Sequence, residues 1–480
     1  MNDVSKVKAS NSSVALKAGI WYVVSSVLVR MVSVITTPIF TRMLSTDEYG
    51  VVSTFSTWYS LFLVIYSLNL AASIGRAKLD YPDKLDDYIG SMQLLSLIVS
   101  LTISAVIVIF INPFSSLFDL SVPATVLLLV YLIATPSINF YQCGYRYKYL
   151  YKQNIALAWY TTISTVALSL ILIICVKYDK ALLRMVGLVF PTVLMSLVFW
   201  IKSIKKRNIR VNLEYWKYGL NIALPMILHT ISMNILSGSD RIVISKTWGS
   251  TPVAYYSLVQ NYAILIMVIT EAINQAWQPW FHDNFFIGKN DEIKSNVKKL
   301  VVFICYMGLA CIAIGPEAIL ILGGKQYADA VSCIPPLVMG VVCQCIYTHY
   351  INIELHMKKT KYAAEGTMLA AVLNIVLNLI FVPLLGYSAA AYTTFASYLV
   401  LLALHCMITR KRLKVKVYDD VFMFAAMFIA GIVAFIVAMT YDTVLIRWCI
   451  IITGFISFLF VFRSYIFNFF KNVRKKRTGN

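Results

Sequence analysis

An arginine lies inside the first apolar stretch of the chain, where its charge requires water or a partner. Residues 16–50 read LKAGIWYVVSSVLVRMVSVITTPIFTRMLSTDEYG, long enough to cross a bilayer, with Arg30 near the middle. A guanidinium at the centre of a membrane helix costs at least ~2.5–3.5 kcal/mol, so it is tolerated where it faces a wet cavity or a partner. Its planar fork suits a phosphate, because it donates two parallel hydrogen bonds. We therefore predict that Arg30 binds a phosphate in a hydrated chamber. The alternative is a structural pairing with a carboxylate or with backbone carbonyls.

Two further stretches carry charged residues at the ends of apolar segments. Arg42 follows the first segment, and Arg241 and Lys246 lie at the corresponding end of a later one. Such side chains either extend towards the membrane surface or take over phosphates as a chamber opens. Asp240 is expected to accept hydrogen bonds from Arg241 or Arg42.

Glu271 lies within an apolar segment on a polar stripe that includes Gln275, because residues four apart share a helix face. A carboxylate at membrane depth faces a bundle interior or water. Glu271 is therefore predicted to pair with Arg30, to bind a coupling proton, or to accept hydrogen bonds from sugar hydroxyls. The sequence leaves these three roles open.

The composition is that of a polytopic helical membrane protein. Of the 480 residues, 59% are hydrophobic and only 13% are charged, whereas soluble proteins carry about 25% charged residues. The net charge of +20 does not indicate nucleic acid, because the basic residues lie in short connections between apolar runs. The nine cysteines form no C-x-x-C pair, and His349, Glu354 and His356 lack the spacing of a metal site. No metal or cofactor is expected.

Fourteen apolar segments are predicted to cross the membrane. They lie near residues 17–40, 49–73, 88–112, 120–142, 155–177, 181–201, 217–240, 253–277, 297–322, 331–355, 362–385, 387–408, 419–441 and 445–468. The connections after the even-numbered segments, together with the two ends of the chain, hold 33 of the 42 basic residues. Because basic loops stay in the cytoplasm, both termini are predicted to be cytoplasmic. No connection is longer than about 20 residues, which leaves no room for a catalytic domain.

The two halves of the chain resemble each other. The segment LKAGIWYVV with PIFTRMLSTDEYGVVSTF is echoed about 200 residues later by WKYGLNIALP with SDRIVISKTWGSTPVAYYSLV. We therefore expect an all-α fold in which two six-helix bundles surround a central cavity. The predicted units are a first lobe at 1–205, a second lobe at 206–412, and two more helices with a basic tail at 413–480. The tail sequence KNVRKKR (471–477) is typical of a contact with anionic phospholipid.

Three short motifs carry a resemblance to a known family. The first comprises Pro38, Arg42, Leu44, Tyr49 and Gly50. The second comprises Ser239, Asp240, Arg241, Gly249 and Tyr255. The third comprises Asn374, Asn378, Pro383, Gly386, Thr393 and Thr394. Together they resemble the polysaccharide-biosynthesis (Wzx-type) flippases of the multidrug/oligosaccharidyl-lipid/polysaccharide exporter superfamily. The chain departs from many relatives at Ser45, where they have glycine.

The resemblance implies a flippase rather than an enzyme. Such proteins move undecaprenyl-pyrophosphate-linked oligosaccharides, the repeat units of O-antigen, capsule or exopolysaccharide, from the inner to the outer leaflet of the bacterial cytoplasmic (inner) membrane. The expected mechanism is alternating access. The head group binds in the chamber, the lipid tail stays in the bilayer, and the two lobes rock. A polysaccharide polymerase and chain-length proteins are the implied protein partners.

The resemblance extends to the lipid II flippases, which implies a cation site in the second lobe. Asn374 and Asn378 share a helix face, and Thr394 lies on the next predicted segment. These side chains either hydrogen-bond between helices or supply oxygen ligands to a sodium ion. Asp240 or Asn234 would complete the sodium shell. Sodium and proton coupling both stay open.

Four other functions compete with this interpretation. A lipid II flippase and a multidrug extruder share the expected fold, although an arginine-lined chamber is poorly suited to the organic cations that extruders bind. A membrane polysaccharide polymerase or ligase is the rival from another class, and such enzymes use a sizeable external loop. A scaffold protein would not explain the buried charge.

Overall fold

The computed structural model describes residues 21, 25, 28–32, 34–206, 208–357 and 359–463, without the side chains of residues 276 and 360. Much of the first predicted membrane segment and the basic tail predicted to contact phospholipid lie outside the described residues. Within the described ranges nearly every residue is helical, and no β-strand occurs.

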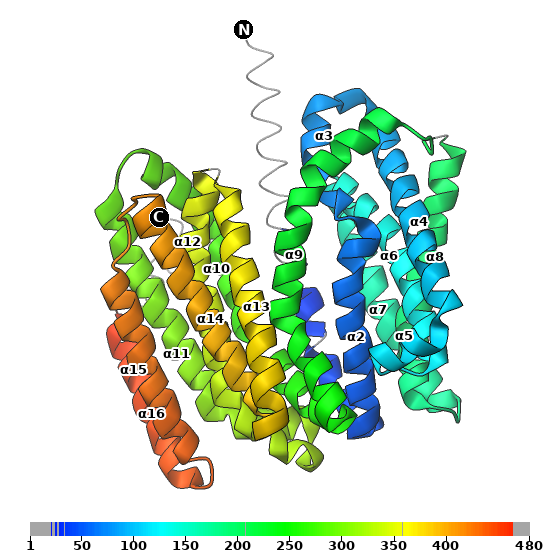
Figure 1. The fold of residues 1–480 in the computed structure, drawn as a ribbon. Helices are drawn as coiled ribbons and strands as arrows, with labels where there is room; N and C mark the ends of the chain where they lie inside the picture. Colours follow the sequence, from blue (N-terminus) through cyan, green and yellow to red (C-terminus); the bar gives the residue numbers. More distant parts are fainter. Residues whose placement is uncertain are drawn as a thin grey trace, which may run out of the picture.

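The helices run up and down the long axis of the molecule (Figure 1). Residues 34–43 are helical and lead into α2. The following elements are α2 (Thr46–Ser67), η1 (Leu70–Ser73), α3 (Ile74–Asp80), η2 (Pro82–Lys84), α4 (Leu85–Ile109), α5 (Ile111–Phe118), α6 (Val122–Tyr147), α7 (Tyr151–Cys175), α8 (Lys180–Lys205), α9 (Leu213–Trp248), α10 (Ser250–Phe286), α11 (Asn290–Gly323), η3 (Lys325–Cys333), α12 (Ile334–His356), α13 (Thr360–Leu385), α14 (Ala389–Met407), η4 (Ile408–Arg412), α15 (Asp420–Met439) and α16 (Val444–Val461).

Thirteen helical segments within the described ranges are long and apolar enough to cross a membrane. They coincide with the second to fourteenth predicted segments, so the prediction of an all-helical, polytopic membrane protein is confirmed. The largest boundary errors concern α9 and α10, with 36 and 37 residues. Such helices are about 55 Å long, which is longer than the ~30 Å hydrocarbon core. The prediction identified only the apolar part of each helix, so it missed the polar residues at the ends.

The start of α2 explains why this chain can have serine at position 45, where many relatives have glycine. The Ser45 hydroxyl accepts a hydrogen bond from the Glu48 amide at 3.1 Å, and the Glu48 carboxylate accepts one from the Ser45 amide at 2.7 Å. This reciprocal pair is a capping box, which satisfies two amides that a helix start leaves unpaired. Because Ser45 has a φ of −65°, this turn does not require glycine.

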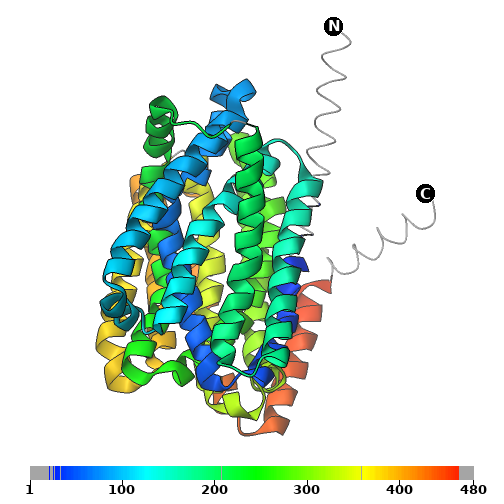
Figure 2. The same cartoon turned by 90° about the vertical axis from the view of Figure 1, so that its right-hand side faces the viewer.

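Two groups of helices lie side by side. We call the helices up to α8 the first half and those from α9 to α16 the second half. Seen after a 90° turn, the cyan and teal helices of the first half lie in front of the yellow and orange helices of the second (Figure 2). Each half has its own apolar core, around Phe55 and Leu128 in the first and around Val338 and Leu401 in the second.

Helix α9 packs against both halves. Near its start, Tyr215 and Ala223 pack in a cluster with Leu70 of the first half, whereas Leu236 and Ile244 farther along belong to the core of the second. Pro225 lies between these two stretches. The predicted division into lobes at residue 205 stays a prediction, since packing alone assigns α9 to neither lobe.

The start of α9 is also joined to α3 by hydrogen bonds. The Tyr218 hydroxyl donates to the Asp80 carboxylate at 2.5 Å, and Arg76 donates to the same carboxylate at 3.0 Å. The hydrogen bond from Tyr218, followed by the one from Arg76, lowers the pKa of Asp80 below its usual range. We call this end of the molecule the α3 end.

The opposite end, where α5 and η3 lie, is closed by hydrogen bonds between the halves. We call it the α5 end. Thr41 donates to the carbonyl of Leu322, and Gln326 donates back to the Thr41 carbonyl at 2.7 Å. On the other side of the interface, Lys246 of α9 donates to the carbonyl of Ser116 in α5. These bonds must break before the halves can separate at this end.

The last two helices, α15 and α16, pack on α11. Most of α16 is exposed, and its buried residue is Arg447. The Arg447 guanidinium donates to the carboxylate of Glu317 on α11 and, at 2.7 Å, to the carbonyl of Tyr441. A polar contact therefore fixes an otherwise apolar helix.

We predict that Gly50 is required for closure of the α5 end. A Cβ atom at Gly50 would lie 1.8 Å from the backbone oxygen of Ser250, and backbone cannot move aside as a flexible side chain can. Gly50→Ala should therefore destabilise the purified protein by about 1–3 kcal/mol in thermal or denaturant unfolding, as overpacking does. Gly431→Ala is the control, because a Cβ there meets nothing within 4 Å. Equal stability of the two variants would contradict this account.

Candidate functional site

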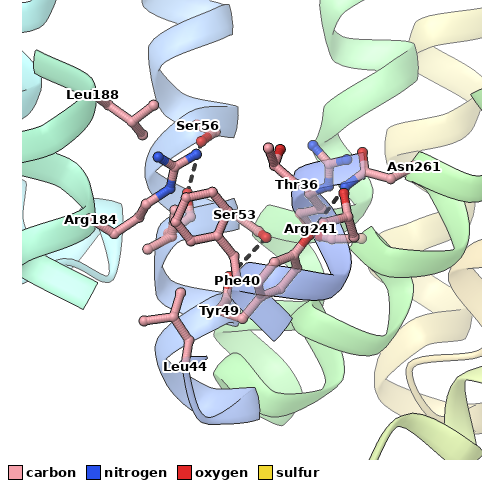
Figure 3. A pocket seen from close by; sticks show the side chains of 13 residues that line it. Thr36, Phe40, Leu44, Tyr49, Ser53, Ser56, Arg184, Leu188, Arg241 and Asn261 are labelled. Atoms are coloured by element: carbon pink, nitrogen blue, oxygen red, sulfur yellow. Dashed lines mark hydrogen bonds between the residues drawn. The ribbon is translucent and has the colours of Figure 1, made fainter. Parts of the chain in front are cut away.

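A cavity of about 230 Å³ lies between the two halves, towards the α5 end (Figure 3). Its walls come from the helical segment before α2 and from α2, α8, α9 and α10. The lining includes Phe40, Tyr49, Arg184, Arg241 and Asn261. The remaining lining residues in the described part of the chain are threonine, serine or aliphatic, and none of them is acidic.

Arg241 reaches this cavity from α9, as its predicted role requires. Its guanidinium donates to the Thr57 hydroxyl at 3.3 Å and to the side-chain oxygen of Gln260. Its Nε is buried and has no hydrogen-bond partner among the described residues. The expected pairing with Asp240 is wrong, because adjacent helical residues point about 100° apart and Asp240 faces another set of donors.

Arg184 of α8 is the second cation in the cavity, and the sequence analysis did not single it out. It donates to the Ser169 hydroxyl, and its guanidinium lies 3.8 Å from the centre of the Phe40 ring. Because Arg184 is close to Lys177 and Lys180 in the sequence, the sequence analysis counted it as part of a connecting loop. Its position inside the predicted segment 181–201 was the signal that could have found it.

Arg30 is not among the residues that line the cavity. It forms an ion pair with Glu271 of α10 at 2.6 Å, so the structure realises one of the three roles predicted for Glu271. Both side chains are almost half exposed, at 44% and 46%, and an ion pair this accessible contributes about 1 kcal/mol or less. Arg30 is seven residues from Thr37, which lines the cavity, or about 10 Å along a helix.

Three of the predicted site residues lie elsewhere. Arg42 donates to the carbonyls of Pro38 and Ile321 at 2.9 Å each, and Lys246 donates to a carbonyl of α5. Gln275 is exposed on α10 and does not line the cavity. The structure therefore brings together Arg241 and Arg184 in one place and Arg30 and Glu271 in another.

Asp240 is the centre of a separate polar cluster that is buried inside the second half. Its carboxylate accepts hydrogen bonds from Tyr256 and Asn378 at 2.6 Å, from Thr394 at 2.9 Å and from Asn374 at 3.3 Å. All five side chains are buried, which fits the rule that a buried charge is paired or fully hydrogen-bonded. The structure thus gathers the residues predicted for a cation site.

The oxygen atoms of this cluster are engaged in internal hydrogen bonds. The Asn374 side-chain oxygen accepts from Ser239 at 2.7 Å, and the Asn378 oxygen accepts from Thr393. Asn234, the alternative ligand, instead donates to the carbonyl of Ser60 at 2.8 Å. Sodium prefers oxygen ligands, and the cluster offers several once the amides and hydroxyls turn. No group of three His, Cys, Asp or Glu side chains that could hold a metal occurs in the described part of the chain.

Comparison with known proteins places this arrangement in a family. Residues 15–285, more than half of the chain, match the family model described as polysaccharide biosynthesis protein. The chain belongs to the polysaccharide biosynthesis protein family. The match contains the first two motifs, whereas the third, at residues 374–394, lies beyond it.

A curated relative of this polysaccharide biosynthesis protein is the Lsg locus putative protein 1 of Haemophilus influenzae. The two are 23% identical over 288 residues, which is 56% of this chain. The aligned stretch covers 66% of the relative, just under two thirds of its length.

Solved structures of transporters share the fold. The lipid II flippase MurJ in an inward closed conformation matches with a TM-score of 0.71 and 14% identity, over 93% of this chain and all of that one. An inward-facing MATE-family multidrug resistance transporter of the MOP superfamily matches with a TM-score of 0.58 and 17% identity, over 81% and 98% of the two chains. A MOP-superfamily transporter from Pyrococcus furiosus matches with a TM-score of 0.59 and 15% identity, over 83% and 96%. At these identities the likeness shows the fold, which is that of a multi-pass membrane protein.

The hydrogen bonds to Asp240 lead to a test of the buried cluster in this family member. Tyr256→Phe removes one donor and leaves the carboxylate short of a partner, which should lower the free energy of unfolding by about 1–3 kcal/mol. The control is Tyr392→Phe, since Tyr392 is exposed on α14. Denaturant unfolding of the purified proteins measures both. If Tyr256→Phe proved as stable as wild type, the cluster would not depend on these donors.

Proposed function

We propose that this protein moves a lipid-linked, negatively charged saccharide across the membrane. The observation that carries the proposal is the cavity between the halves, where the described lining includes two arginines and no acidic residue. Membership of the polysaccharide biosynthesis protein family supports a saccharide cargo. The specific substrate that we propose is an undecaprenyl-pyrophosphate-linked oligosaccharide, moved from the inner to the outer leaflet of the bacterial cytoplasmic membrane. In this scheme the α3 end and both termini lie in the cytoplasm.

A charged head group needs such a passage. Transfer of a pyrophosphate with its glycan into hydrocarbon would remove the water around several charges, at a cost far above thermal energy. A hydrated chamber lined by arginines replaces that water with charge-assisted hydrogen bonds, while the polyprenyl chain remains in lipid. Separation of the halves at the α5 end would then release the head group.

Coupling to a cation is part of the proposal. Asp240, Asn374, Asn378 and Thr394 lie together in the second half and could supply oxygen ligands to sodium if their internal hydrogen bonds rearranged. Glu271 is the candidate for a proton, because it is accessible and already pairs with Arg30. In the first option sodium binds Asp240 of α9, and in the second a proton binds Glu271 of α10.

Two alternatives keep the same fold. A lipid II flippase would carry the same diphosphate on a different sugar, and MurJ, a lipid II flippase, matches over its whole length. A multidrug extruder would bind organic cations, which the charge of this cavity disfavours. A polymerase or ligase from another class would need a catalytic loop.

We propose further that a polysaccharide polymerase with chain-length proteins takes over the cargo and that anionic phospholipid contacts residues 471–477.

We predict that Arg30→Ala abolishes polysaccharide export. The substitution removes the cation that pairs with the Glu271 carboxylate, so the proposed chamber loses one positive charge. The assay is restoration of surface polysaccharide in a flippase-deficient strain, with membrane abundance measured by immunoblot. Lys361→Ala is the control, because Lys361 is exposed at the α3 end. Wild-type export by Arg30→Ala would remove Arg30 from the mechanism.

A second experiment concerns the buried cluster. If sodium is the coupling ion, export by the wild-type protein should fall when the sodium gradient is collapsed. Asp240→Asn, which weakens the one charged ligand, should make the remaining activity insensitive to sodium. Transport into inverted membrane vesicles at fixed pH measures both effects. Unchanged transport without the gradient would exclude sodium coupling.

A further inference from the structure

A glutamate and a histidine meet inside the second half, apart from the cavity and from the Asp240 cluster. Glu354 lies near the end of α12 and His405 near the end of α14, two helices that pack side by side and end at the α3 end (Figure 1). The Glu354 carboxylate and the His405 Nδ1 are 2.8 Å apart, and both side chains are 0% exposed. His405 is about 16 Å along α14 from Thr394 of the Asp240 cluster.

Each member of this pair has a polar atom that the described residues leave without a partner. These atoms are the Oε2 of Glu354 and the Nε2 of His405, both buried and without a hydrogen bond. Asp240 differs, because four neutral donors surround its carboxylate and can compensate its charge. The Glu354 carboxylate has the imidazole alone, so its charge depends on the protonation of that one partner.

The neighbouring helices do not supply another cation. Helices α12 and α14 pack against α9, α10, α11, α13, α15, η3 and η4, of which η3 lies at the α5 end. The ionisable side chains on the parts of these elements nearer the α3 end are His229 on α9, Glu271, His282 and Asp283 on α10, Asp291, Glu292, Lys294 and Lys298 on α11, Lys361, Tyr362 and Glu365 on α13, Arg410, Lys411 and Arg412 on η4, Asp420 on α15, and Tyr347, His349, Tyr350, His356, Tyr398 and Cys406 on α12 and α14 themselves. None of the described lysines and arginines among them forms an ion pair with Glu354; those that form ion pairs do so with Asp419, Asp420 or Glu365.

The net charge of the pair therefore depends on one proton. Without it, an ionised Glu354 beside a neutral His405 leaves one negative charge in the interior, and burial of an uncompensated charge is costly. With it, the pair is neutral overall, whether the proton lies on the carboxylate or on the imidazole. A second proton would create a buried positive charge at a similar cost. The interior thus favours the state with a single proton.

We propose that Glu354 and His405 form a proton-binding site, which holds one proton between the carboxylate and Nδ1 and releases it when water reaches the pair. A Cβ atom at Gly366 would lie 2.9 Å from the His405 Nε2, so the backbone of α13 covers this nitrogen and leaves no room for a metal ion with its ligands. A proton needs no such space. Uptake and release move a proton without breaking any other covalent bond.

His229 lies between this site and the interface of the two halves. Its Nδ1 is hydrogen-bonded to the hydroxyl of Thr367 at 3.0 Å, and Thr367 follows the glycine that covers His405. The next residue of α9, Thr230, accepts a hydrogen bond from Asn69 of the first half at 3.3 Å. Because His229 is partly exposed, a proton that leaves the buried pair can reach water through its imidazole.

The proton acts on the packing of the second half. An occupied pair is neutral and keeps α12 against α14 at the α3 end, whereas an empty pair favours separation there because its charge gains water. Glu271 differs in this respect, since it is almost half exposed and gains or loses a proton without leaving water. That the buried proton drives transport rests on the proposed function; that Glu354 and His405 bind it does not.

The direct test is the thermal midpoint of the purified full-length protein in nanodiscs, measured from about pH 7 to about pH 9. In this range an unfolded chain retains almost no proton on a glutamate or a histidine, so unfolding of the wild type releases the proton of the pair. The wild-type midpoint should therefore fall as the pH rises. Glu354→Gln keeps a hydrogen bond to His405 but binds no extra proton. Its midpoint should fall less steeply, by a difference in slope that corresponds to one proton.

Glu365→Gln is the matched control, because Glu365 lies on neighbouring α13 and pairs with the exposed Arg412. It should keep the wild-type slope. If Glu354→Gln does not fold, Glu354→Met together with His405→Leu replaces both polar partners by apolar side chains, which buried pairs tolerate, and should show the same reduced slope. A purely structural pair would lower the midpoint of either variant by the same amount at every pH. That result overturns the proposal.

A second arm tests the coupling separately. Export into inverted membrane vesicles by the wild type should fall when the proton gradient is collapsed, and the remaining export by Glu354→Gln should be insensitive to the gradient. Unchanged wild-type export, together with the one-proton difference in slope, would support the site and overturn its role in coupling. Absence of saccharide export by the wild type would contradict the proposed function and leave the slope as the test of the site. Conversely, equal slopes with export intact would overturn the site alone.

Discussion

The structure depends on the cost of holding charge inside a membrane. A cation or carboxylate at that depth must find water, an opposite charge or several hydrogen bonds, and this chain uses all three. Arg447 pairs with Glu317 beneath α16, Asp240 is surrounded by neutral donors, and Arg30 meets Glu271 where both are accessible. Arg184 and Arg241 at the cavity instead donate hydrogen bonds to neutral oxygen atoms.

The positions of these groups follow from the helical architecture. Each half packs its own apolar core, and the polar residues that neither core accommodates lie at the interface between them. Arg42 and Lys246 donate hydrogen bonds there to backbone carbonyls of the opposite half, so these residues join the halves rather than line the cavity. The interface thus contains both the hydrogen bonds that close the α5 end and the cavity that Arg184 and Arg241 line.

Much of the fold could be predicted from the sequence, because apolar length and loop charge are local signals. Segments from α2 to α16 coincide with the predicted ones, and the four-residue spacing of Asn374 and Asn378 placed them beside Thr394 correctly. Partners across helices could not be predicted. Asp240 directly precedes Arg241 in the sequence but faces Tyr256 and the two asparagines, since neighbours on a helix point apart. Arg184 was missed because two nearby lysines made it resemble a loop residue.

The course of α9 limits how the protein can change shape. One stretch of this helix packs in a cluster with residues of the first half and a later stretch packs in the core of the second, so one continuous helix connects the two halves. Pro225, between the two stretches, removes one backbone hydrogen bond and weakens the helix there. Any change in the angle between the two halves would therefore require α9 to bend near Pro225.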